Sequence, residues 1–87
     1  MQPHEIENTV IRLSAEQVGA DPASVSRGTH YVNDLRFDSL DAVDLAMRIE
    51  EALAVGIPDD QIEKLQSVGQ MIDYVRARRQ SEQSLRS

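Results

Sequence analysis

The stretch that decides the fold is residues 34–53, DLRFDSLDAVDLAMRIEEAL. Its second part, from Ser39 to Leu53, contains neither glycine nor proline, and its apolar residues recur every one to four positions with acidic residues between them. This spacing predicts an amphipathic helix. The apolar residues of the predicted helix are Leu40, Val43, Leu45, Ala46, Met47, Ile49 and Leu53.

Charged residues mark the start of this helix. Asp38 can accept a hydrogen bond from a backbone N–H of the first turn, and Asp41 places negative charge at the positive end of the helix dipole. Asp44 and Arg48 are four residues apart, so we expect a surface ion pair worth roughly 0.2 to 0.5 kcal/mol. The sequence therefore predicts a helix that starts at Ser39.

The segment before this stretch predicts one helix and one long loop. From Pro3 to Val18, apolar residues recur at helical spacing, and Gly19 is a suitable end. These apolar residues are Ile6, Val10, Leu13 and either Ala15 or Val18. Residues 20–37 are rich in Asp, Pro, Ser, Gly and Asn, which predicts a loop with at most a short helical turn. We expect Val25, Tyr31, Val32 and Leu35 to pin this loop to the core.

The segment after the stretch predicts two more helices. Gly56-Ile57-Pro58 interrupts the chain, and a short third helix is expected over residues 59–65. Ser67 and Gln70 have the spacing of a capping box that opens a fourth helix. Its buried face is expected to contain Val68, Met71, Ile72 and Val75. Residues 1–79 are thus expected to form the domain, and residues 80–87 a disordered tail.

The expected fold is an all-α four-helix bundle with a short third helix and a long loop between the first two helices. The 87 residues suffice for one small domain. The net charge is −6, and residues 34–63 hold nine acidic residues against Arg36 and Arg48. This charge disfavours nucleic acid and favours a partner with a basic surface.

Cysteine is absent, which excludes a disulfide, a thiolate nucleophile of the chain's own and a zinc site built on sulfur. The chain shows neither a secretion signal nor an apolar run of membrane-spanning length. We therefore expect a cytoplasmic monomer that does not insert into membranes and holds no metal.

Ser39 is the residue with the clearest chemical potential. Its hydroxyl lies at the start of a helix, where free N–H groups and the helix dipole favour an attached phosphate. From position alone, however, a simple capping role for Ser39 is the favoured interpretation.

The motif around Ser39 resembles that of the acyl carrier proteins of fatty acid and polyketide synthesis. The resemblance rests on three parts: DL-x-FDSLD-x-VDL at residues 34–45, Glu50-Glu51, and Ile57-Pro58-Asp59. It extends from the first predicted helix through Ile72-Asp73-Tyr74-Val75, about three-quarters of the chain.

The resemblance implies a carrier without catalytic activity. Ser39 would receive 4′-phosphopantetheine from coenzyme A through a phosphopantetheinyl transferase, and the thiol of that arm would carry an acyl group as a thioester. The cargo would then be presented to acyl-transferring and chain-elongating enzymes of fatty acid, lipid or polyketide-type synthesis. The arm would supply the thiol that this cysteine-free chain lacks.

The resemblance also implies two sets of residues with different tasks. The face that meets basic patches on partner enzymes would consist of Asp38, Leu40, Asp41, Val43, Asp44, Met47, Glu50 and Glu51. The core, which in this family can open around a bound acyl chain, would consist of Leu45, Ala46, Ile49, Leu53, Ile57, Ile62, Leu65, Val68 and Ile72. Whether this chain sheaths its cargo stays open, and the acidic face could simply confer solubility.

Two departures from the family pattern stand before Ser39. Arg36 occupies a position where glycine is usual, and Thr29-His30-Tyr31 replaces a smaller lead-in. We favour Arg36 as a surface residue near Asp34 and Asp38, although it could pair with the new phosphate or discriminate between partners. His30 is expected to be a loop residue and not a catalytic base. The departures slightly favour a dedicated carrier over a housekeeping one.

Other functions fit the sequence less well. A serine hydrolase lacks its Gly-x-Ser-x-Gly turn here, and the acidic residues of the predicted helix lack the spacing of a calcium loop. An acidic helical adaptor that is never modified remains a rival, as does a peptidyl or aminoacyl carrier. Phe37-Asp38 before Ser39 favours acyl cargo by family analogy.

Overall fold

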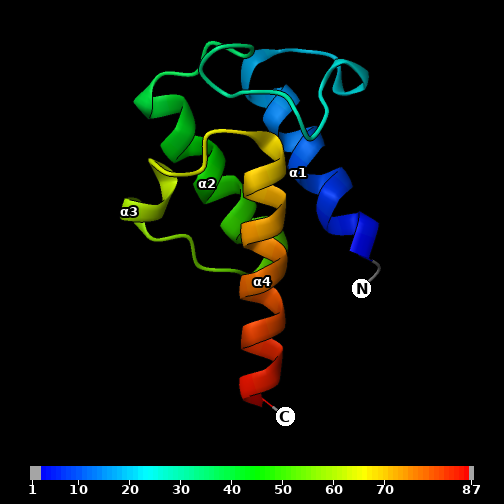
Figure 1. Ribbon diagram of the computed structural model, residues 1–87, viewed down its shortest axis with the longest axis vertical. Helices are drawn as coiled ribbons and strands as arrows, with labels where there is room; N and C mark the ends of the chain where they lie inside the picture. Colours follow the sequence, from blue (N-terminus) through cyan, green and yellow to red (C-terminus); the bar gives the residue numbers. More distant parts are fainter. Residues whose placement is uncertain (1–2, 87) are drawn as a thin grey trace.

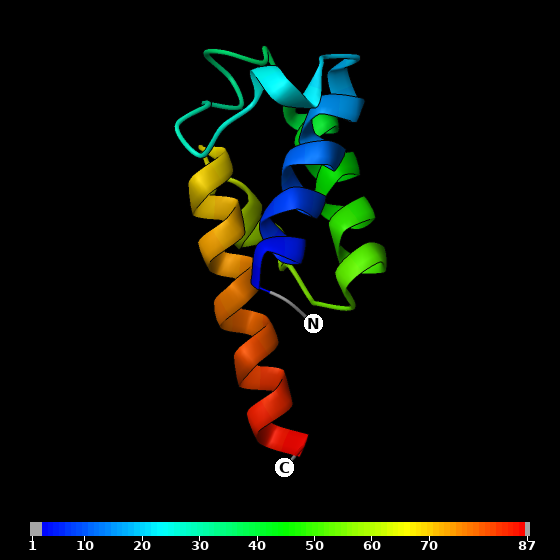
Figure 2. The ribbon, with the colours of Figure 1, turned by 90° about the vertical axis from the view of Figure 1, so that its right-hand side faces the viewer.

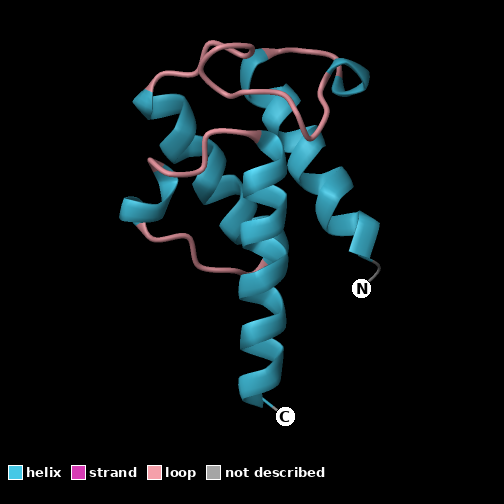
Figure 3. Ribbon diagram, in the orientation of Figure 1, coloured by secondary structure: helices cyan, strands magenta, loops and turns pink. Residues whose placement is uncertain are grey.

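The computed structural model describes residues 3–86, with side chains for residues 4–80. The described chain is helical, and its elements in order are α1 (Pro3–Val18), the short 3-10 helix η1 (Pro22–Ser24), α2 (Ser39–Leu53), α3 (Asp59–Ile62) and α4 (Val68–Arg86). Figure 1 shows α1 running towards the top of the molecule and α2 and α4 running down from it. Figure 3 shows that loops join these helices and that no strand occurs in the described chain. The predicted all-α bundle is confirmed.

The limits of the helices follow from local sequence. α1 and α2 have the bounds that their apolar spacing and flanking residues predicted. The predicted capping box opens α4, because Ser67 Oγ accepts from Gln70 N at 3.2 Å and Gln70 Oε1 accepts from Ser67 N at 3.1 Å. α3 ends at Ile62, earlier than the predicted residue 65, since residues 63–66 only turn back towards α4.

α4 is the longest helix of the described chain. The helix continues to Arg86, beyond the predicted domain boundary, and the disordered tail over residues 80–87 stays a prediction. The physical reason for this continuation is that residues 80–86 contain neither glycine nor proline, and nothing in them interrupts the helical hydrogen bonds. Figures 1 and 2 show these last turns of α4 projecting beyond the other helices. The domain boundary at residue 79 stays a prediction, and residue 87 lies outside the described residues.

A single core lies between α1, α2 and α4. The buried apolar residues are Ile6, Val10, Leu13, Ala15, Val25, Tyr31, Phe37, Leu45, Ala46, Ile49, Leu53, Val55, Ile57, Val68, Met71, Ile72 and Val75. Two residues expected in the core, Ile62 and Leu65, are only partly buried. They lie on or just after α3, which is a single turn at the side of the bundle (Figure 1) and leaves their outer sides uncovered.

The long loop before α2 is fixed to the bundle by polar contacts. Tyr31 is buried, and its hydroxyl lies 2.9 Å from Ser14 Oγ of α1. Its ring packs against Phe37 with a centroid separation of 4.9 Å. Val32, which we expected in the core, is 57% exposed, because the loop turns outward after Tyr31. Tyr31 and not Val32 therefore anchors the loop.

The same loop caps α4. Thr29 O accepts a hydrogen bond from Val68 N, and Arg27 O accepts one from Gly69 N, both at 2.9 Å. These are first-turn N–H groups that a helix leaves without internal partners. A Cβ added to Gly69 would lie 2.9 Å from Arg27 O, so this close approach requires glycine. The loop thus connects α1 and α4 before it delivers the chain to α2.

None of the described helices combines the length and the hydropathy that spanning a bilayer requires.

Candidate functional site

Asp38 and Asp41 determine how α2 begins. Asp38 is the N-cap residue, and its Oδ1 accepts from Asp41 N at 2.9 Å. Asp41 Oδ2 accepts in return from Asp38 N at 3.2 Å. This is a reciprocal capping box with aspartate in place of the usual glutamate. The sequence predicted the cap at Asp38 but only a charge effect for Asp41. The three-residue spacing of two carboxylates is the signal that could have revealed the second bond.

Ser39 is the first residue of α2, and its side chain is exposed. Among the described residues its hydroxyl forms no hydrogen bond, because Asp38 performs the capping. The interpretation that Ser39 merely caps the helix is therefore wrong. The capping box holds the first turn in place and leaves the Ser39 hydroxyl exposed to solvent.

A cleft of about 740 Å³ opens beside Ser39. It is bounded by the loop before α2, the first half of α2, and the segment from α3 to α4. Its lining residues are His30, Tyr31, Val32, Asn33, Phe37, Asp38, Ser39, Ala42, Val43, Leu45, Asp59, Ile62, Glu63, Leu65, Gln66 and Met71. Phe37, Leu45 and Met71 are buried, so the inner part of the cleft is apolar, whereas Asp59 and Glu63 are exposed. An apolar group attached near Ser39 could enter this cleft.

His30 shapes the loop at the border of the cleft. Its Nδ1 accepts from Val32 N at 3.2 Å and from Asn33 N at 3.0 Å. Its backbone N–H donates to Asp34 Oδ2 at 2.7 Å. These bonds close the turn that follows Tyr31, so His30 has a structural role in the loop.

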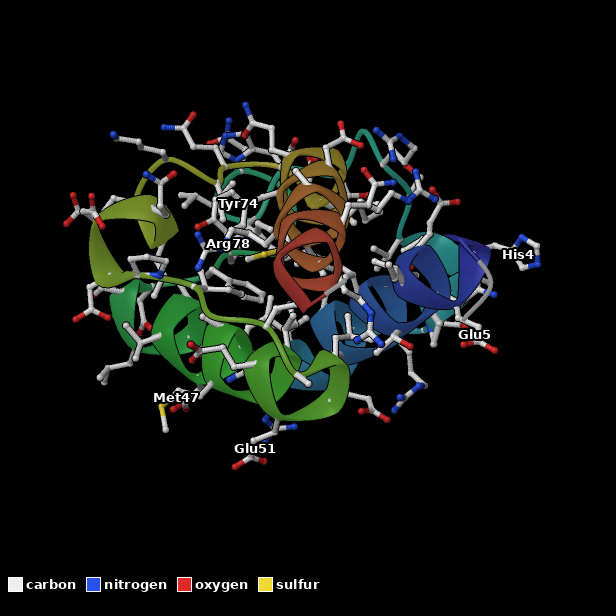
Figure 4. All side chains as sticks on the ribbon, turned by 90° about the horizontal axis from the view of Figure 1, so that it is seen from below. His4, Glu5, Met47, Glu51, Tyr74 and Arg78 are labelled. Carbon is white, nitrogen blue, oxygen red and sulfur yellow. The ribbon has the colours of Figure 1, made fainter. Side chains whose placement is uncertain are left out.

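The outward face of α2 combines apolar and acidic side chains. Leu40 is 73% exposed, Val43 42% and Met47 56%, and the three follow one another at helical spacing. Asp44 and Glu51 are also exposed. Figure 4 shows Met47 and Glu51 pointing away from the bundle. Exposed apolar residues beside acids are typical of a surface that meets a partner.

The eight residues expected on the partner face fall into two groups. Asp38, Asp41 and Glu50 form hydrogen bonds within the chain: the first two make the capping box, and Glu50 Oε2 accepts from Ile57 N at 2.9 Å. The other five are Leu40, Val43, Asp44, Met47 and Glu51, and the structure leaves them uncovered. The predicted Asp44–Arg48 ion pair is absent from the ion pairs of the described side chains, whose N···O distances are at most 4 Å.

The far end of α2 is held from α4. Ala54 follows the helix with a left-handed φ of 54°. The Arg79 guanidinium donates a hydrogen bond to Leu53 O, one of the carbonyls that a helix end leaves free. Figure 4 shows the neighbouring Tyr74 and Arg78 directed from α4 towards the side where α3 lies. The position of α2, and so of Ser39, therefore depends on contacts at both helix ends.

These features suit a phosphate-linked arm. Ser39 offers an exposed hydroxyl, the start of α2 offers the positive end of its dipole, and the cleft offers apolar space beside the attachment point. The family model for the phosphopantetheine attachment site matches residues 8–75. The match runs from α1 into α4 and includes Ser39 and the cleft. Domains of this kind carry a covalently attached 4′-phosphopantetheine, are modified by phosphopantetheinyl transferases and generally act as carriers without catalysing reactions. This chain belongs to the phosphopantetheine attachment site family.

Proposed function

We propose that this protein is an acyl carrier protein in which Ser39 bears the 4′-phosphopantetheine arm. The observation that carries the proposal is the exposed Ser39 hydroxyl, which forms no hydrogen bond within the described chain and opens α2 inside the family match. The arm supplies a terminal thiol for a thioester, and the chain itself has no cysteine that could do so. The protein itself holds the attachment point, offers a cleft for the cargo, and presents the cargo to partner enzymes.

The cleft supports acyl cargo. Its buried lining is made of aromatic and aliphatic side chains, among them Phe37, Leu45 and Met71, which suit an alkyl chain better than a charged amino group. Of the nine core residues expected to sheath the chain, Leu45, Ile62 and Leu65 line this cleft. On acylation, the methyl NMR signals of these residues should shift. Unchanged signals would count against sequestration while leaving the carrier role intact.

The outward face of α2 is the proposed docking surface for the transferase and for acyl-processing enzymes of fatty acid, lipid or polyketide-type synthesis. Asp44 and Glu51 are its best charged candidates, because their carboxylates are exposed and form no ion pair with the described side chains. Asp38, Asp41 and Glu50 can contribute charge, but their replacement would also disturb the helix ends.

The docking surface can be tested through transferase kinetics. Asp44→Lys with Glu51→Lys should lower kcat/KM roughly two- to fivefold for each charge reversed at low salt, and the deficit should shrink as salt screens the charges. Glu5→Lys on α1 is the matched control, since Figure 4 shows Glu5 far from Glu51 and Met47. Equal losses in the control and in the α2 variant would refute a docking role for this face.

The attachment itself is tested by intact mass. The protein is incubated with coenzyme A and a broad-specificity phosphopantetheinyl transferase, with Ser39→Ala as the control. A gain of one phosphopantetheine that the control lacks would support the carrier function. No gain with several transferases would favour the rival, an acidic adaptor that is never modified. Loading assays with acyl and aminoacyl donors would separate an acyl carrier from a peptidyl carrier.

A further inference from the structure

Arg36 has a backbone conformation that favours glycine. Its φ is 58°, in the left-handed region that costs a residue with a Cβ roughly 1–2 kcal/mol. The loop imposes this conformation, because Arg36 N donates to Val32 O at 3.1 Å and the next residue, Phe37, is buried. The backbone conformation therefore favours glycine at position 36 and does not explain the presence of arginine.

The side chain of Arg36 is not used within the protein. It is exposed, and it forms neither an ion pair nor a hydrogen bond with the side chains of residues 4–80. The nearest carboxylates in sequence are already engaged by backbone N–H groups. Asp34 Oδ2 accepts from His30 N at 2.7 Å, and Asp38 Oδ1 accepts from Asp41 N at 2.9 Å. An internal salt bridge therefore does not explain Arg36.

Ser39 lies in an acidic segment in which Arg36 is the nearest cation. Arg36 is the only arginine or lysine in residues 28–47, which also contain Asp34, Asp38, Asp41 and Asp44. A phosphodiester on Ser39 would add another negative charge to this acidic segment. Asp38 and Asp41 already occupy the positive end of α2, so the helix dipole is shared. A cation near the attached phosphate would offset this negative charge, and Arg36 is the arginine or lysine nearest to Ser39 in sequence.

We propose that Arg36 binds the phosphodiester of the arm on Ser39 and so fixes the first atoms of the arm against the loop before α2. The inference rests on the proposed attachment at Ser39. Three residues span at most roughly 11 Å, a separation that a long arginine side chain and a flexible phosphoserine linkage can bridge. The guanidinium group suits a phosphate because its planar N–H groups can donate two parallel hydrogen bonds.

The test compares the apo and holo forms of the full chain. Arg36→Gln removes the charge but keeps a Cβ in the left-handed conformation, so the backbone cost is unchanged. Arg36→Lys keeps the charge without the planar fork. Arg48→Gln is the matched control, because Arg48 is an exposed arginine of α2 nine residues beyond Ser39, roughly 13 Å along the helix. Intact mass first establishes that each variant carries one arm.

Two quantities are then measured. The difference in melting temperature between holo and apo protein should be roughly 2–4 °C more positive in wild type than in Arg36→Gln at low salt, and this excess should shrink at high salt. Arg36→Lys should keep part of the excess and Arg48→Gln all of it. In the holo protein, the ³¹P signal should move in Arg36→Gln, and attachment should shift the Nε–H signal of Arg36 in wild type.

The outcomes separate this inference from the function on which it rests. Absence of any mass gain at Ser39 would overturn the proposed attachment and the inference with it. Full attachment with equal holo–apo differences in wild type and Arg36→Gln, and with unmoved ³¹P and Nε–H signals, would overturn the inference alone.

Discussion

At several positions of this protein, the fold restricts which residue type is tolerated, either through the backbone angles or through the space for a side chain. Arg36 and Ala54 both have a left-handed φ, and each follows or precedes a buried apolar residue that holds the chain in place. Gly69 is restricted by space and not by its backbone angles, since it lies against the backbone of Arg27 and leaves no room for a Cβ. Substitutions at these positions should therefore change the free energy of unfolding in opposite directions.

Arg36→Gly should stabilise the apo protein by about 0.5–1 kcal/mol. Glycine removes the steric cost of the left-handed φ, and part of the gain is lost because the unfolded chain becomes more flexible. The measurement is urea denaturation followed by circular dichroism. Arg48→Gly is the control, and in the interior of α2 it should instead destabilise by about 1 kcal/mol. A destabilised Arg36→Gly protein would show that the arginine side chain supports the apo fold.

Gly69→Ala should destabilise the protein by about 1–3 kcal/mol, because the new methyl group would lie 2.9 Å from Arg27 O and would displace the loop from α4. Gly28→Ala is a matched control in the same loop, where the nearest atom to an added Cβ is Ser26 Oγ at 3.9 Å. Thermal unfolding of both variants decides the matter. Similar melting temperatures for the two would mean that the loop yields easily.

At the scale of elements, α2 is defined by what caps its two ends. The Asp38–Asp41 box closes its start, and Arg79 from α4 donates to Leu53 O at its end. α4 receives its own caps from Ser67 and from the carbonyl groups of the long loop. Because the caps come from other elements as well as from neighbours in sequence, the helices support one another's ends.

Asp38→Ala should destabilise the protein by about 0.5–2 kcal/mol, since Asp41 N loses its acceptor and the first turn of α2 frays. The local effect is measured as faster amide hydrogen exchange in residues 39–42. Asp44→Ala removes a carboxylate from the same helix without removing a cap and should leave both quantities nearly unchanged. Unaltered exchange in Asp38→Ala would show that the box does not hold this turn.

At the scale of the whole molecule, the bond between Tyr31 and Ser14 joins the long loop to α1. Burial raises the pKa of Tyr31 to about 12, although the hydrogen bond with Ser14 opposes the shift. The folded state therefore disfavours the tyrosinate that the unfolded chain forms above about pH 10. The stability contributed by neutral Tyr31 is complete below pH 10 and is lost as the pH rises towards 12.

The free energy of unfolding should accordingly fall by up to about 1.4 kcal/mol per pH unit between pH 10 and 12 because of Tyr31. Urea denaturation at pH 8, 10 and 11 measures the fall. Tyr31→Phe should be less stable at pH 8, since the buried Ser14 hydroxyl loses its partner, but it should lack this part of the alkaline fall. Tyr74→Phe keeps the Tyr31–Ser14 bond and should therefore show the same alkaline fall in the free energy of unfolding as the wild type. An unchanged fall in Tyr31→Phe would contradict the assignment.

The sequence by itself determined the bounds of α1 and α2, the capping box of α4, the acidic character of α2 and the family motif around Ser39. These features depend on residues within about one helical turn of each other, so apolar spacing and cap chemistry were enough to predict them. Segments such as residues 39–53, which contain neither glycine nor proline, favour an uninterrupted helix.

Only the tertiary structure decided which residues meet across the chain. It engaged Glu50 with Ile57, turned Val32 outward, and gave Arg36 a left-handed φ. It also formed the cleft from three separate segments and brought Arg79 to the end of α2. These outcomes depend on how loops turn and how separate segments pack together, and the periodicity of apolar residues carries no information about such contacts.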